Sequence, residues 1–296
     1  MKVDKKIAIS FDVDMTDYTD QSAIDEFTYF SRIKEILIEL DYVKTTWFLR
    51  LDDHMGKIFG ANEYLFTQYQ NDLNWLRSMG HEIAFHFHSY ELKANQWIQC
   101  VNEDIISEEL YRSALKGRSF GLSGVRMGWG FHTNQTMQIV DELGYKYDSS
   151  AIPRPKYHFD RSIRDWSVTL QGAYQPSLSD YRVAGKPCYR ILEIPISTVA
   201  IKSPSDEIQM LRMINPSFKT DVLLDSVAKV TTDYVIMATH PVELATSRLH
   251  HPLLSHSFTV FKENLRKLAA LNYEFVTIGS LASSIAPCTT EVARQN

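Results

Sequence analysis

The sequence is poor in cysteine and has no excess of positive charge, and both features exclude classes of protein. Its three cysteines, Cys100, Cys188 and Cys288, are too few and too widely spaced for a disulfide framework or for paired CxxC metal ligands. Lys and Arg total 31 against 36 Asp and Glu, which gives a net charge of −5 with neutral histidines. Because nucleic acids and anionic membranes are bound through clustered cations, we expect neither as a partner.

Long apolar runs and a recognisable export signal are also missing. No stretch approaches the roughly 18 consecutive apolar residues of a membrane span, and the mean hydropathy is −0.23. The basic first residues run into Asp12 and Asp14 after an apolar stretch that is too short for the core of a signal peptide. We therefore expect a cytoplasmic protein in a reducing compartment, with no membrane span.

The sequence does contain a repeated alternation of strand-like and helix-like segments, and 44% of its residues are hydrophobic, enough for a large core. Short apolar segments predict strands at 6–11, 45–50, 82–88, 191–197, 234–240 and 273–279. Apolar spacings of three and four predict helices at 22–40, 64–79, 103–115, 135–143 and 258–271. Segment 145–190 has weak periodicity and is expected to be loop cover. The pattern predicts one α/β domain over residues 1–296, with about seven mostly parallel strands in a sheet or barrel.

Polar side chains stand where three of these strands end. Asp12 and Asp14 follow the first strand, His86 and His88 end the third, and His240 ends a later one. Residues two apart on an extended chain project to one face, so these groups are expected to converge on one rim. Taken alone, each of these residues also fits a purely structural role, as the cap of a turn or as a buried histidine with hydrogen-bond partners. Together they favour a divalent metal site, with Zn²⁺ as the best match to mixed Asp and His ligands.

Several short motifs, in order, resemble the polysaccharide deacetylases of the NodB-homology type, carbohydrate esterase family 4. These motifs are Ser10-Phe11-Asp12-Val13-Asp14, Gly80-His81-Glu82-Ile83 leading into His86, Gly124-Val125-Arg126-Met127-Gly128-Trp129, and Gly144 to Ser150. The resemblance implies a distorted (β/α) barrel. It implies Asp12 as general base, Asp14 and His86 as metal ligands, Arg126 as the group that orients Asp12, and the backbone N–H near Trp129 as an oxyanion donor.

The sequence departs from the family at the second histidine of the second motif, where Tyr90 stands. The third metal ligand is then His88, Tyr90 or water, and we favour His88. Thr239-His240-Pro241 resembles the motif that supplies the general acid, His240. Asp165-Trp166 resembles the motif whose acid partners that histidine and whose tryptophan walls the acyl pocket. His250, His251 and His256 lie in a polar loop and are expected to be exposed rather than ligands.

The resemblance implies a metal-dependent hydrolase that removes an N-acyl group, acetyl or formyl, from an amino sugar or glycan precursor in cell-surface polysaccharide metabolism. Two alternatives stay open: a metal-free amidohydrolase of the same fold acting on a cyclic amide or ureide, and a non-catalytic carbohydrate-binding relative. Phosphoryl chemistry is disfavoured, since no glycine-rich phosphate loop is present. The acyl group, the sugar and the oligomeric state are not fixed by the sequence.

Overall fold

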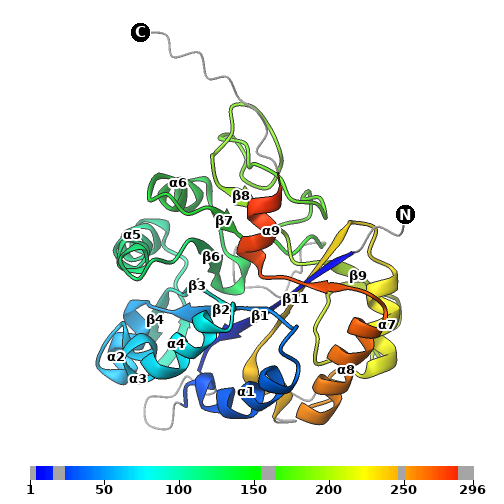
Figure 1. Ribbon diagram of the computed structural model, residues 1–296. Helices are drawn as coiled ribbons and strands as arrows, with labels where there is room; N and C mark the ends of the chain where they lie inside the picture. The colour runs from blue at the N-terminus through cyan, green and yellow to red at the C-terminus, as the bar shows by residue number, and fades with distance from the viewer. Residues whose placement is uncertain (1–4, 16–23, 155–164, 246–250, 286–296) are drawn as a thin grey trace.

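The computed structural model describes residues 5–15, 24–154, 165–245 and 251–285 (Figure 1). Its centre is a sheet of parallel strands in the order β11, β1, β2, β3, β6, β7, β8, with β12 also paired to β1. The strands are β1 (Lys6–Val13), β2 (Thr45–Arg50), β3 (Glu82–Phe87), β6 (Gly124–Met127), β7 (Tyr147–Asp148), β8 (Leu192–Glu193), β11 (Tyr234–Thr239) and β12 (Glu274–Phe275). Two antiparallel hairpins lie outside it, β4 (Tyr90–Lys93) with β5 (Gln96–Gln99), and β9 (Thr198–Ile201) with β10 (Met210–Met213).

Helices surround the curled sheet (Figure 1). They are η1 (Glu26–Tyr29), α1 (Phe30–Glu39), α2 (Asp53–Phe59), α3 (Tyr64–Gln68), α4 (Gln70–Ser78), α5 (Glu103–Ser119), η2 (Gly128–Gly130), α6 (Asn134–Glu142), α7 (Thr220–Ala228), η3 (Pro241–Leu244), α8 (Phe258–Ala270) and α9 (Ile278–Ser284). Local capping starts several of them. The side chains of Asn102, Thr133 and Ser257 accept backbone N–H groups of the first turns of α5, α6 and α8. The predicted α/β barrel is confirmed, in the distorted form that the resemblance implied.

The two faces of the sheet are filled by different residues. In β1, Ile7, Ile9 and Phe11 point outward and pack in the larger core under the helices. Ala8 points inward, where it joins a second cluster that includes Phe48 of β2 and Ile278 of α9. This alternation follows from the two-residue repeat of an extended chain. The inward-facing residues near the C-terminal end of each strand therefore lie at the carboxyl end of the barrel.

The two edges of the sheet, β8 and β11, are joined by an extended segment that is not a regular strand. Of the predicted strand 191–197, only β8 is regular, and beyond it Ile196 N donates to Ala151 O at 2.9 Å. Ser197 N then donates to Ile236 O of β11 at 3.0 Å. The contacts at 194–197 thus join the two edges of the sheet.

Several predicted boundaries were wrong because tertiary contacts override the local pattern. The segment 273–279 is only partly strand, since α9 begins at Ile278 and packs on the inner cluster. The helix expected at 64–79 is divided at Tyr69, whose hydroxyl donates to Asp25 at 3.0 Å. The start of the helix expected at 22–40 falls partly outside the described residues, and the described part begins as η1. Helices α2 and α7 and both hairpins were not predicted.

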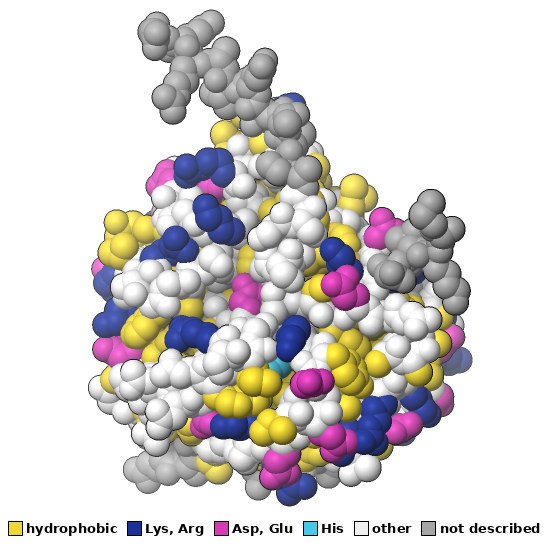
Figure 2. All heavy atoms as spheres, viewed as in Figure 1, with side chains coloured by type: hydrophobic (Ala, Val, Ile, Leu, Met, Phe, Trp, Pro, Cys, Tyr) yellow, Lys and Arg dark blue, Asp and Glu magenta, His cyan; other side chains and the backbone are white. Residues whose placement is uncertain are grey.

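The described part of segment 145–190 contains β7 but no further helix or strand, as expected for loop cover. Among the described residues, no helix combines the length and apolar composition needed to cross a bilayer. Acidic and basic side chains are interspersed on the face shown in Figure 2. The cytoplasmic location stays a prediction.

Candidate active site

Inward-facing residues of neighbouring strands form the polar rim predicted from the sequence. Ser10, Asp12 and Asp14 follow one another on the inner face of β1 and beyond its end, and His86 and His88 do the same on β3. His240 directly follows β11. Because β11, β1, β2, β3 and β6 are adjacent and parallel, these side chains meet at one end of the barrel.

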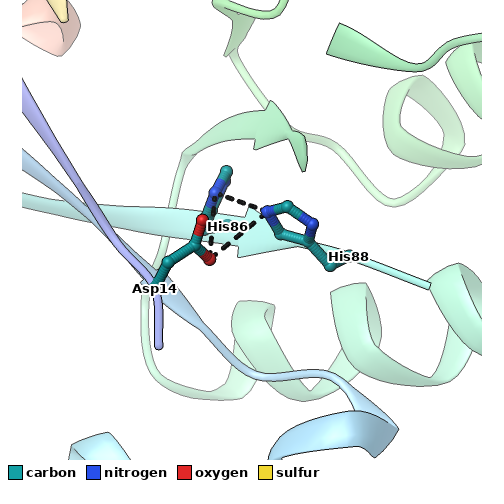
Figure 3. A group of neighbouring side chains, drawn as sticks. All are labelled: Asp14, His86 and His88. Carbon is teal, nitrogen blue, oxygen red and sulfur yellow. Dashed lines mark hydrogen bonds and ion pairs between the residues drawn. The ribbon is translucent and has the colours of Figure 1, made fainter. Parts of the chain in front are cut away.

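Asp14, His86 and His88 form a compact buried group (Figure 3). Their potential ligand atoms all lie within 4.8 Å of one another. His86 Nε2 and His88 Nε2 are 3.1 Å apart, and Asp14 Oδ1 is 3.8 Å and 3.3 Å from them. One carboxylate and two imidazoles facing a common point match the donor set of a catalytic zinc site with an open fourth position.

The hydrogen bond on the far side of His86 fixes which nitrogen faces this point. His86 Nδ1 lies 2.9 Å from the carbonyl oxygen of Arg126, which can only accept, so Nδ1 carries the proton. Burial lowers the pKa of His86 to about 4, so the ring is neutral and its Nε2 lone pair points at Asp14 and His88. A ligating histidine is held in this way by a partner on its other nitrogen.

Asp14 is ionised, and its position suits a cation. Burial alone would raise the pKa of Asp14, but the imidazoles of His88 and His240 outweigh it and hold the pKa well below its usual range. Asp14 Oδ1 has no hydrogen-bond partner among the described residues. A buried carboxylate oxygen that accepts no hydrogen bond is costly, and coordination to a cation would offset that cost. The residues present therefore fit a divalent metal ion.

The position of His88 depends on a glycine. A Cβ at Gly128 would lie 2.3 Å from His88 Nε2 and Cε1, so only glycine leaves room for the ligating edge of the ring. Tyr90 and Trp129 pack against the same imidazole, with ring centroids 5.5 Å and 4.3 Å away. Tyr90, which stands at the family's second-histidine position, is thus a wall of the His88 pocket. The choice of His88 over Tyr90 or water as third ligand is consistent with this packing and stays a prediction.

A buried arginine that the sequence reasoning missed lies behind Asp14. Arg50, at the inner end of β2, is completely buried and binds Asp52 through Nε at 2.7 Å and Nη2 at 2.6 Å. Its Nη1 is 3.6 Å from Asp14 Oδ1. Asp52 in turn accepts the backbone N–H of His88 at 3.3 Å. Arg50 and Asp52 therefore connect the carboxylate of Asp14 to the backbone of His88. The inward position of Arg50 on its strand was the signal available in the sequence.

Asp12 is bound by the arginine predicted to orient it. Arg126 Nη1 donates to Asp12 Oδ1 and to Ser10 Oγ, both at 2.7 Å. Its Nε and Nη2 donate to the carbonyl and hydroxyl of Ser149, at 2.8 and 3.0 Å. The guanidinium lies 4.1 Å from the ring centroid of Phe48. Arg126 is thus held from several sides, and Asp12, which it binds through Oδ1, borders the cavity.

The acid beside His240 is Glu243, not Asp165 as the sequence predicted. Glu243 Oε1 is 3.8 Å from His240 Nδ1, and Oε2 accepts the backbone N–H of His240 at 3.1 Å. Asp165 instead accepts from Arg182 Nη1 at 2.7 Å and from the hydroxyl of Ser167 at 2.6 Å. The η3 turn directly after β11 brings Glu243 back to His240, whereas the short Asp-Trp match carried no information about distance.

His240 is held in its protonated form. Burial acts to lower its pKa, but Asp14 Oδ2 at 3.5 Å and Glu243 raise it well above the usual value. Asn215 Nδ2 donates to Glu243 at 2.6 Å, and the Thr239 hydroxyl does so at 2.8 Å. The pKa of Glu243 is lowered to about 2 against the effect of burial, chiefly by His240. The side chain of His240 is still 31% exposed, so a ligand can reach it.

These groups line one cavity of about 250 Å³. Asp12, Asp14, His86, His88 and His240 supply its polar wall, and the rest comes mainly from Arg126, Met127, Trp129, Ile152, Ile196 and Met213. Trp166 does not line this cavity. Its Nε1 donates to Gly130 O at 2.7 Å, behind the wall, so its predicted role as a wall of the acyl pocket is not supported. His250 lies outside the described residues.

Comparison with known proteins bears on the fold. No profile of a known protein family matches the sequence, and no curated protein matches it. Among solved structures, a protein of Mycobacterium smegmatis with a provisional description as a polysaccharide deacetylase superposes with a TM-score of 0.52, at 16% identity, over 97% of this chain and 94% of its own. A 4-alpha-glucanotransferase of Thermococcus litoralis also gives 0.52, at 12% identity, with 96% of this chain and 41% of that chain covered.

The second structure belongs to a different kind of enzyme and superposes equally well, so similarity of fold alone does not identify the reaction. What the superpositions establish is the architecture that the motifs had indicated. The chain therefore has the fold of the polysaccharide deacetylase type, a distorted barrel of parallel strands.

Proposed function

We propose that this protein is a metal-dependent amide hydrolase that removes an N-acyl group, acetyl or formyl, from an amino sugar or glycan precursor. The observation that carries the proposal is that one cavity is lined by the Asp14, His86 and His88 group, by the Asp12–Arg126 pair, and by His240, whose acid partner Glu243 lies next to the cavity. Their residues come from the ends of β1, β3, β6 and β11 and from the segments that follow them. Hydrolysis of an amide needs a group to activate water, a base and an acid, and these groups can supply them.

Asp14, His86 and His88 would hold one divalent ion, for which Zn²⁺ is our choice because mixed carboxylate and imidazole ligands suit it. When bound, such an ion acts as a Lewis acid toward the amide carbonyl and its attacking water. The chain's own contribution is to present the neutral Nε2 of His86 and the ionised carboxylate of Asp14 before the ion arrives.

Asp12 is the proposed general base. Its carboxylate borders the cavity, and Arg126 fixes it by the 2.7 Å bond from Nη1. A proton removed from water would be taken up by Asp12 while Arg126 keeps the carboxyl group in place. The backbone N–H of Trp129 is the proposed donor to the developing oxyanion, and Trp129 borders the same cavity.

His240 is the proposed general acid. It stands on the opposite side of Asp14 from His88, is accessible, and is kept protonated by its two acid neighbours. Its proton would pass to the departing nitrogen, which makes the amine a better leaving group. Glu243 acts as the positioning residue for this histidine, in the role that the sequence had assigned to Asp165.

The test is release of free amine from N-acetylglucosamine oligomers, by protein stripped with a chelator and then reloaded with Zn²⁺. We expect no amine from the stripped protein and recovery at about one ion per chain. Full activity after exhaustive chelation would instead favour the metal-free amidohydrolase. Sugar binding without amine release from any N-acyl sugar, with the ion bound, would favour the non-catalytic carbohydrate-binding protein.

We also propose that residues 1–296 act as one domain. Strand β1, near the start of the chain, pairs with both β11 and β12, which come more than two hundred residues later. Removal of the C-terminal end would leave β1 paired with β2 alone, which argues against two independently folding parts.

A further inference from the structure

Trp129, whose backbone N–H is the proposed oxyanion donor, has a strained backbone. Its φ of 55° and ψ of 9° lie in the left-handed region, which a bulky residue occupies only at a cost in free energy. A residue keeps such a conformation only where the surrounding structure enforces it. The direction of the Trp129 N–H therefore depends on what holds the segment 127–132, which we call the Trp129 loop.

Contacts within and beside the Trp129 loop shape its turn. Phe131 N donates to Gly128 O at 3.1 Å, which closes the turn. Trp166 Nε1 donates to Gly130 O at 2.7 Å, which holds the middle of the loop from outside. The position of the turn relative to the sheet also depends on what holds the two ends of the loop.

Both ends of the Trp129 loop are tied to one buried carboxylate, that of Asp148 in β7. At the first end, Met127 N donates to Ser150 Oγ at 2.7 Å, and Ser150 Oγ donates to Asp148 Oδ1 at 2.5 Å. At the second end, His132 Nε2 lies 2.9 Å from Asp148 Oδ2. The side chains of Asp148, Ser150 and His132 are all buried. One carboxylate therefore links the two ends of the loop.

This link follows from the pairing of β7 with β6. The pairing brings Met127, at the end of β6, beside Ser150, just beyond β7. Asp148 and Ser150 share one face of the extended chain, whereas Ser149 points to the other face and binds Arg126. Of the described residues that line the cavity with the proposed catalytic groups, Ser150 is one and Asp148 is not. Asp148 can therefore act on the reaction only through other residues.

Asp148 carries the charge of a buried pair of carboxyl groups. Burial acts to raise the pKa of Asp148, but the imidazole of His132 and hydrogen bonds from its neighbours hold that pKa below its usual value. Burial, and after it the charge of Asp148, raise the pKa of Glu193 well above its usual value, so Glu193 is neutral. Hydrogen bonds to a charged acceptor are stronger than those to a neutral one. Asn in place of Asp148 would thus hold the loop less firmly.

We propose that Asp148 is a positioning residue, which fixes the direction of the Trp129 N–H by holding both ends of the Trp129 loop. The mechanism proposed above gives Asp148 no role. Donors stabilise a developing oxyanion best when their direction is fixed in advance, and loosening the ends would let the strained residue relax. The inference rests on the proposed function for the role of the N–H, but not for the effect of Asp148 on the conformation of Trp129.

Fluorine NMR of protein labelled with fluorinated tryptophan tests the conformational part, with Zn²⁺ at saturation and without substrate. Trp129→Phe identifies the signal of Trp129. In Asp148→Asn we expect this signal to move by more than its line width, while the signal of Trp75 on α4 stays in place. Ser150→Ala, which breaks the link at the first end, should move the Trp129 signal too, and it decides the test should Asp148→Asn fail to fold.

The matched control is Ser226→Ala. It also removes a buried serine hydroxyl, but one that donates to Val222 O within α7 at 2.7 Å. It should leave the Trp129 signal and the rate of amine release unchanged.

Amine release from N-acetylglucosamine oligomers at saturating Zn²⁺ tests the catalytic part. Asp148→Asn should lower kcat by about tenfold or more and change KM by less than about twofold, because an oxyanion donor acts in the transition state. A merely structural role would lower the free energy of unfolding in urea and leave the Trp129 signal and kcat of the folded variant unchanged. That result would overturn the inference, as would a change in only one of the two in an active protein.

The two measurements separate this inference from the proposed function. A Trp129 signal that Asp148→Asn moves, in a protein that releases no amine, supports the hold of Asp148 on the loop and counts against the hydrolase. Amine release by the wild-type protein, with neither the signal nor kcat changed in the variants, supports the hydrolase and overturns the positioning role.

Discussion

Replacing Gly128 by alanine should displace His88 and with it the metal ion. The added Cβ would lie 2.3 Å from His88 Nε2, where ordinary contact begins at 3.4 Å, so the ring must retreat by about 1 Å. Zinc-ligand distances tolerate changes of only about 0.2 Å. The φ of Gly128 is not in the left-handed region, so backbone strain does not compete as an explanation.

We expect Gly128→Ala to weaken Zn²⁺ binding by about 100-fold, near the upper end of what loss of a ligand's support costs. Overpacking should also lower the free energy of unfolding by about 1 to 3 kcal/mol. The assay is titration of stripped protein with Zn²⁺ against a chelating dye, together with urea unfolding. The two readouts separate a change in the site from a change in stability.

Two other glycines provide matched controls. At Gly172 an added Cβ meets no atom within 4 Å, so Gly172→Ala should leave both readouts unchanged. At Gly124, which lies in β6 just before Gly128, the Cβ would lie 2.0 Å from Tyr147 Cζ, and the three nearest atoms all belong to Tyr147, which is not a proposed ligand. Gly124→Ala should lose stability and keep the ion. A folded Gly128→Ala protein with wild-type Zn²⁺ affinity would refute the reasoning.

Four further outcomes are expected. His88→Ala should lose the bound ion while Tyr90→Phe keeps it, as measured by plasma mass spectrometry; the reverse would make Tyr90 the ligand. Asp12→Asn should keep fold and ion but lose about 10² to 10⁴ in amine release, and a near wild-type rate would exclude Asp12 as base. Glu243→Gln should slow amine release by about tenfold or more while Asp165→Asn does not, and equal effects would contradict the placement of the acid. Burial and, to a lesser extent, the charge of Lys44 lower the pKa of His81 to about 4. The unfolded chain therefore takes up a proton at this histidine before the folded protein does, so the free energy of unfolding is highest above about pH 6.5 and falls as the pH drops toward 4. In urea melts, His81→Asn should flatten this acid loss by about 2 kcal/mol, and an unchanged slope would rule His81 out.

The positions of most proposed site residues could be predicted from the sequence because strand parity is a local property. Asp12 and Asp14 share the inward face of β1, as His86 and His88 do on β3, and parallel strands bring those ends together. Arg126 was found through its motif, and its bond to Asp12 crosses from β6 to β1, two strands that β2 and β3 separate in the sheet. The same parity on β2 places Arg50 on the inward face at the end of that strand.

Other features depended on contacts between distant parts of the chain. The helix expected at 64–79 divides at Tyr69, which bonds to Asp25 more than forty residues earlier. The strand expected at 273–279 ends early, because Ile278 is drawn into the inner cluster as the start of α9. Periodicity reports which residues are apolar, but it does not report which partner will bury them.

The sequence by itself determined the alternation of strands and helices, the polar ends of the strands and the composition of the proposed metal group, because each follows from the local repeat of the chain. Only the tertiary structure decided that Glu243 and not Asp165 lies beside His240, because the η3 turn after β11 folds Glu243 back onto that histidine. It also decided that Gly128 leaves room for His88, and that Asp148 links the two ends of the Trp129 loop. These are distances between segments far apart in the chain, which packing sets and no local pattern encodes.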